Sequence, residues 1–108
     1  GSIGRLLKMQ DESINYDQID EIFENIESLD MIDVWKNSDV LYQSKENITH
    51  LLEYINIILF EKLKQTNNLH YSNCISYVEQ TKSRLSSNAN FDMCIDNLLL
   101  KVWEEFHE

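Results

Sequence analysis

The sequence contains no proline and only two glycines, and this constrains the fold more than any other feature. Both glycines lie at the start, at Gly1 and Gly4, so the rest of the chain lacks the residues that usually separate short strands. Sandwiches and barrels need such turn signals about every 8–12 residues. The sequence therefore predicts long helices that are joined by short polar segments.

Apolar residues recur with helical spacing along most of the chain. The spacing predicts helices over residues 2–9, 16–29, 31–41, 48–63, 71–85 and 91–106. Ser44 is the expected N-cap of the central helix, which is apolar around a wide arc. The 108 residues suit one domain. We expect a compact all-α bundle of about five main helices, because the first segment is short.

The formal net charge is −10, which is the opposite of what a surface that binds nucleic acid phosphates requires. We therefore expect no direct contact with nucleic acid. The apolar run at 55–60 is interrupted by Asn56 and is far too short to cross a bilayer. No signal peptide opens the chain, so a cytoplasmic location without membrane contact is expected. Cys74 and Cys94 fall on apolar helical positions, which predicts two reduced thiols in the core.

The sequence offers few candidates for catalysis or metal binding. His50, His70 and His107 are scattered and belong to no catalytic or zinc motif. Glu104 and His107 form a Glu-x-x-His step, but a carboxylate-bridged di-metal site needs two such steps and two further glutamates. The acidic residues within 17–27 lie mostly opposite the apolar stripe, where water is expected to solvate them. We expect neither a cofactor nor an enzymatic activity of this chain by itself.

The last predicted helix carries two apolar strips. At about 100° per residue, one arc forms the predicted core contact and consists of Cys94, Ile95, Leu98, Val102 and Phe106. Met93 and Leu100 lie about half a turn away, on the face that also holds Asn97 and Glu104. Two interpretations remain open: the helix is covered on both sides within its own bundle, or Met93 and Leu100 contact a partner.

Residues 1–7 and 81–100 contain two stretches that resemble the clamp loaders of bacterial DNA polymerase III. The segment at 1–7, Gly-Ser-Ile-Gly-Arg-Leu-Leu, resembles the start of the helix that carries the sensor 2 position in AAA+ subunits. The second stretch comprises Thr81-Lys82-Ser83-Arg84-Leu85, Asn88-Ala89-Asn90-Phe91 and Ile95-Asp96-Asn97-Leu98-Leu99-Leu100, and it resembles the penultimate turn and final helix of bacterial delta prime subunits.

The resemblance implies that residues 1–12 end the AAA+ lid region and that 13–108 form a C-terminal helical domain, one sector of the collar that holds the loader together. The implied partners are the gamma/tau and delta subunits, and the implied role is subunit assembly during sliding-clamp loading in DNA replication. ATP-hydrolysing relatives have arginine where this chain has Gly4. Arg5 comes one residue later, which turns it by about 100° on a helix. This degenerate sensor 2 segment suits delta prime, which has no ATPase activity.

Two other functions compete with this interpretation. One is an unrelated acidic helical adaptor that binds a partner helix in a groove, as many small bundles do. The other is a metal enzyme with a carboxylate-bridged centre inside the bundle.

Overall fold

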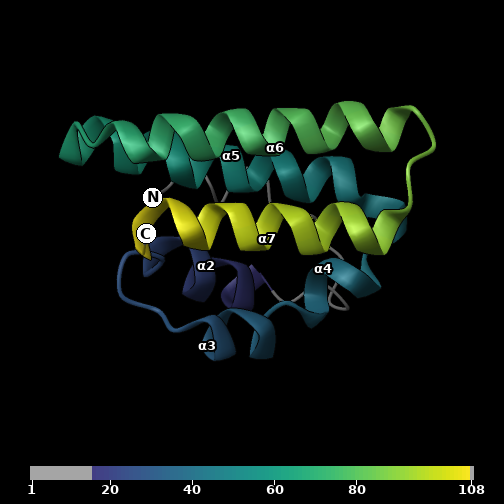
Figure 1. Ribbon diagram of the computed structural model, residues 1–108, viewed down its shortest axis with the longest axis horizontal. Coiled ribbons are helices and arrows are strands. Elements are labelled where there is room, and N and C mark those ends of the chain that lie inside the picture. Colours follow the sequence, from purple (N-terminus) through teal and green to yellow (C-terminus); the bar gives the residue numbers. More distant parts are fainter. Residues whose placement is uncertain (1–15, 108) are drawn as a thin grey trace.

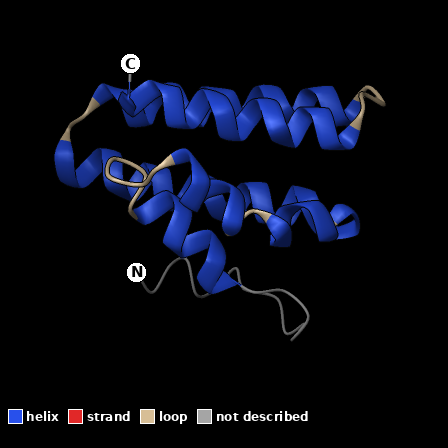
Figure 2. Cartoon of the chain, turned by 60° about the horizontal axis from the view of Figure 1, so that its bottom comes forward, coloured by secondary structure: helices blue, strands red, loops and turns tan. Residues whose placement is uncertain are grey.

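Helices make up most of residues 16–107, the part of the chain that the computed structural model describes, and no strand occurs within it (Figure 2). The elements are α2 (Tyr16–Glu24), α3 (Met31–Lys36), α4 (Asp39–Gln43), the 3-10 turn η1 (Lys45–Asn47), α5 (Ile48–Thr66), α6 (Leu69–Ser86) and α7 (Phe91–His107). The predicted all-α bundle is confirmed. The helix expected over 2–9 and the domain boundary after residue 12 lie outside the described residues.

Helix α7 lies between two groups of helices (Figure 1). Helix α6 packs against both α5 and α7, and α2 packs against α5. The short helices α3 and α4 contact α7 from the other side. The long helices α5, α6 and α7 therefore pack consecutively, and the short helices α3 and α4 cover the side of α7 that faces away from α6.

Asparagines end and begin the long helices. Asn67 ends α5 in the left-handed conformation, with φ 55°, and the side chain of Asn68 caps α6 by accepting a hydrogen bond from the backbone N–H of His70 at 3.0 Å. The next joint repeats this arrangement. Asn88 has φ 64°, and Oδ1 of Asn90 accepts a hydrogen bond from the N–H of Met93 at 3.0 Å. Asparagine tolerates positive φ and caps well, so these joints need no glycine.

The helix predicted over 31–41 is wrong as a single element, because it breaks into α3 and α4. At the break, Nδ2 of Asn37 donates to the Asp33 carbonyl at 2.9 Å and the hydroxyl of Ser38 donates to the Trp35 carbonyl at 2.7 Å. Such side chains compete with the backbone for helical carbonyl groups and favour a turn. Asn25 donates to the Glu21 carbonyl in the same way, and α2 ends at Glu24 instead of continuing to residue 29.

Ser44 does not cap α5, which corrects the prediction. Its backbone has φ −110° and ψ 38°, outside the extended conformation of a capping residue, and its hydroxyl makes no capping hydrogen bond. The N–H of Asn47 instead donates to the Ser44 carbonyl at 3.0 Å, which closes the 3-10 turn η1 ahead of α5. The chain therefore enters α5 through a continuous turn.

The core runs through all the described α-helices. Ile19, Val34, Leu41, Leu51, Ile55, Leu59, Val78, Ile95 and Val102 are fully buried within it. Cys74 and Cys94 are also buried and carry free thiols, as predicted. Burial raises the pKa of the Cys74 thiol to about 12, so the thiol stays protonated and unreactive at neutral pH.

Leu98 and Met93 provide a direct test of which face of α7 belongs to the core. Leu98 is 1% exposed and Met93 is 68% exposed. We expect Leu98→Ala to lower the free energy of unfolding by roughly 2–5 kcal/mol, through lost burial and the cavity it leaves. Met93→Ala should change it by less than about 0.5 kcal/mol. Urea unfolding of both variants measures the difference, and equal losses would contradict this orientation of α7.

Candidate functional site

Helix α7 buries one face and exposes the opposite one. Five of its residues are buried: Cys94, Ile95, Leu98, Leu99 and Val102. Phe106, which was also assigned to the core arc, is only partly buried. Met93 is 68% exposed and Leu100 is 42% exposed. The surface that carries Met93 and Leu100 is therefore open to solvent, and we call it the α7 strip.

Polar contacts hold α7 on the side of the short helices. The hydroxyl of Tyr42 in α4 donates to the carboxylate of Asp96. Nε1 of Trp103 donates to the backbone carbonyl of Leu29 at 2.9 Å, and Trp103 stacks against the ring of His107 with centroids 4.4 Å apart. The two hydrogen bonds join α7 to segments more than fifty residues earlier in the chain. They fix the rotation of α7 about its own axis.

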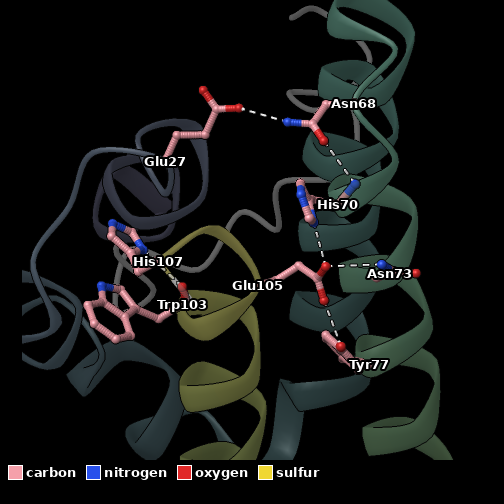
Figure 3. Close-up of polar contacts among 8 residues, drawn as sticks. All are labelled: Glu27, Asn68, His70, Asn73, Tyr77, Trp103, Glu105 and His107. Carbon is pink, nitrogen blue, oxygen red and sulfur yellow. Dashed lines mark hydrogen bonds and ion pairs between the residues drawn. The ribbon is translucent and has the colours of Figure 1, made fainter.

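On the other side, three donors from α6 meet at the carboxylate of Glu105 (Figure 3). Nδ1 of His70 lies 2.6 Å from Oε2, and Nδ2 of Asn73 donates to the same oxygen at 3.0 Å. The hydroxyl of Tyr77 donates to Oε1 at 2.7 Å. The three donors share one face of α6, because residues three and four positions apart are neighbours on a helix. We call this group of four residues the Glu105 clasp.

The Glu105 clasp stabilises a charged carboxylate. Burial by itself would raise the pKa of Glu105, but the hydrogen bonds from His70, Tyr77 and Asn73 outweigh burial and lower the pKa. The hydrogen bond to Glu105 also raises the pKa of Tyr77 to about 12. Glu105 is therefore an anion at neutral pH and Tyr77 a neutral donor, which suits a contact that positions α7 against α6.

The residues considered for a metal site do not form one. Glu104 lies half-buried on α7, whereas Nδ1 of His107 is bonded to the Trp103 carbonyl at 2.9 Å. Within residues 16–107, no group of three or more His, Cys, Asp or Glu side chains is arranged to hold a metal ion. The sensor 2 candidates Gly4 and Arg5 lie outside the described residues. No helix of the described part is long and apolar enough to span a bilayer.

The acidic face of α2 is only partly solvated. Asp17, Glu24 and Glu27 are exposed, as expected, but Asp20 is half-buried. The hydroxyl of Tyr54 in α5 donates to Oδ1 of Asp20 at 2.6 Å, because α2 packs against α5. Asp20 is therefore the exception among these acidic residues, and it serves as an anchor between two helices.

Sequence analysis did not identify Glu105 as an important residue. Its partners His70 and Tyr77 lie 35 and 28 residues earlier, so no local motif connects them. The available signal was the spacing of His70, Asn73 and Tyr77, which puts three polar side chains in one row on α6. That row indicates a contact with Glu105 only when α6 and α7 are known to pack together.

A second apolar feature lies between α5 and α6. A pocket of about 350 Å³ is lined by Asn56, Ile57, Phe60, Glu61, Lys64 and Ile75. The ring of Phe60 is 54% exposed, and the ammonium of Lys64 lies 5.7 Å from its centroid. Oδ1 of Asn56 is buried and has no hydrogen-bond partner among residues 16–107. This pocket has the character of a site for an apolar side chain.

The clasp predicts a pH-dependent loss of stability in Glu105→Gln. The pKa of Glu105 is lower in the folded chain than its unfolded value of about 4.3. The ionised clasp therefore adds its full share to the free energy of unfolding above that pH, and this share disappears as the pH falls through the folded pKa. We expect the free energy of unfolding of the variant to be about 1–3 kcal/mol lower than that of the wild type at pH 7. The gap to the wild type should narrow below about pH 4. Glu53→Gln, on an exposed position of α5, is the control, and a gap that stays constant from pH 7 to pH 3 would contradict the ionised clasp.

Comparison with protein-family models, with curated proteins and with solved structures gives no match for this sequence. Among the described residues, large apolar side chains are exposed on the α7 strip and at the pocket between α5 and α6, and also at Ile32, Trp35 and Leu69. The Glu105 clasp borders the first of these and holds it in place.

Proposed function

We propose that the chain is a protein-assembly domain that binds a neighbouring subunit through the α7 strip. The observation that carries this proposal is the exposure of Met93 and Leu100 on a helix that is anchored on both flanks. An anchored helix cannot rotate to bury these side chains without breaking its polar contacts. A partner that covers them completes the burial instead.

The geometry of the strip suits helix-to-helix contact. Met93 and Leu100 are seven residues apart, which is two turns and about 10 Å along the axis, so both point the same way. Apolar residues with this spacing insert between the side chains of a facing helix. Asn97 and Glu104 provide a polar surround, as interfaces commonly have around an apolar centre. Full burial of an exposed apolar side chain contributes about 1.5–3 kcal/mol, and Leu100 contributes less than this because it is 42% exposed before a partner binds.

The resemblance to delta prime subunits supplies the proposed setting. The domain belongs to the collar of a bacterial DNA polymerase III clamp loader in the cytoplasm, and its partners are the gamma/tau and delta subunits. It supports sliding-clamp loading by holding subunits together and performs no catalysis itself. The charge of −10 supports a partner other than DNA, because the phosphate backbone repels an acidic surface.

The pocket between α5 and α6 favours a second candidate, an adaptor that binds a partner helix. Its lining combines Ile57, Phe60 and Ile75, so one large apolar side chain from an amphipathic helix fits its chemistry. In this case the binding surface lies on α5 and α6, and the α7 strip is ordinary exposed apolar surface. The two candidates therefore place the partner on different helices.

Substitution of Leu100 separates assembly from folding. We expect Leu100→Glu to leave helicity and melting nearly unchanged, because the side chain is 42% exposed, and to weaken binding to cognate gamma/tau and delta subunits at least tenfold. Leu69→Glu is the matched control, since Leu69 is 75% exposed at the start of α6. Circular dichroism and size-exclusion binding assays measure the two effects. If Leu100→Glu unfolds the chain as severely as Leu98→Ala, the strip is core.

The same assay distinguishes the two candidates. Phe60→Ser removes the exposed ring from the α5–α6 pocket and should leave the proposed assembly intact. If Phe60→Ser abolishes binding and Leu100→Glu does not, the chain is an adaptor that binds its partner at the α5–α6 pocket, and the proposed assembly through the α7 strip is wrong.

A further inference from the structure

The pocket between α5 and α6 belongs to a longer hollow on the surface of α5. Both α2 and α6 pack against α5. Where the pocket opens, Ile57 is half-buried and the ring of Phe60 is 54% exposed. Glu61 lines this pocket and also a neighbouring one of about 300 Å³, which Glu24 of α2 borders. The hollow therefore reaches from α6 across α5 to the end of α2.

The chain that precedes α2 joins the described residues close to this hollow. Helix α2 begins at Tyr16, whose ring centroid lies 5.0 Å from that of Tyr54 on α5. Ile57 follows Tyr54 by three residues, which is about 4.5 Å along the helix axis. Residues 10–15 can span up to about 20 Å when extended. The segment 2–9 is therefore within reach of the pocket, and as a helix it would be about 12 Å long.

The composition of this segment complements the hollow. Ile3, Leu6 and Leu7 share one face of the helix that the spacing predicts over residues 2–9. Arg5 and Lys8 lie off that face, and residues 1–9 contain no acidic residue. Because the whole chain carries −10, the rest of it is strongly acidic and attracts this basic segment.

The surface of α5 shows the matching pattern. Glu53 and Glu61 lie four residues before and after Ile57, so all three are neighbours along one row of the helix. Phe60 lies beside this row. An apolar centre between two carboxylates suits an apolar helix face that has cations at its edges.

We propose that residues 2–9 of this chain dock as an amphipathic helix in the pocket between α5 and α6, with the leucine face over Phe60. This inference does not depend on assembly through the α7 strip. Docking removes apolar surface of Ile57 and Phe60 from water. A short linker also holds the segment near the pocket at an effective concentration on the order of millimolar, which a separate partner has to exceed. A partner helix of the adaptor candidate would have to displace the segment.

Limited digestion with trypsin, which cleaves after Arg5 and Lys8, tests the docking. Cleavage follows the population of undocked segment, so Phe60→Ser should raise the initial rate at these two sites roughly tenfold. Met93→Ser is the matched control, because Met93 is 68% exposed on α7, and it should leave the rate unchanged. Mass spectrometry of the fragments measures the rates, and slow cleavage after Lys101 in α7 shows that each variant stays folded. Equal rates in all three proteins would overturn the proposal.

A disulfide assay decides the case even if Phe60→Ser disturbs the fold. The pair Leu6→Cys and Phe60→Cys should form a disulfide within one chain at least tenfold faster than the pair Leu6→Cys and Met93→Cys, because docking brings the first two thiols together. The native cysteines are buried and do not compete. Equal rates for the two pairs would leave the pocket to a separate partner helix and overturn the proposal. A disulfide between two chains would overturn it in favour of a second copy.

Discussion

The packing of α7 between α6 and the short helices determines the rest of the structure. Leu98 and Val102 are buried at the centre of this packing, while Glu105 and Asp96 are bonded to side chains on opposite flanks. Apolar burial supplies most of the free energy, and the polar contacts select one rotation of the helix. Both act on the same seventeen-residue element. A change in the rotation of α7 would disturb both halves of the molecule.

That fixed rotation explains why the α7 strip stays exposed. The anchors Tyr42, Tyr77 and Trp103 hold α7 from either side, and Met93 and Leu100 on the face between them are exposed. Exposed apolar surface costs free energy in an isolated chain, and a rigid strip binds a partner with little loss of conformational entropy. Rigidity and exposure together make this face the best candidate for assembly.

Much of the fold is predictable because the long helices carry strong periodic signals. The positions of α5, α6 and α7 follow from their apolar spacing, and so does the orientation of Met93 and Leu100. The break at Asn37 and Ser38 was not predictable from periodicity. Their side chains donate hydrogen bonds to helical carbonyl groups and interrupt the helix, although the apolar spacing continues past the break. The Glu105 clasp was equally hidden, since its geometry depends on how α6 meets α7 and not on either helix alone.

Oxidation of Met93 tests most directly whether the α7 strip is the assembly face. The thioether of Met93 is exposed in the chain by itself, whereas Met31 is partly buried and provides an internal reference. Mild treatment with hydrogen peroxide, followed by mass spectrometry of peptides, gives the rate of sulfoxide formation at each residue. Assembly with the proposed clamp-loader partners should slow oxidation of Met93 severalfold and leave the rate at Met31 unchanged. Equal rates at Met93 in the free and assembled chain would contradict the account.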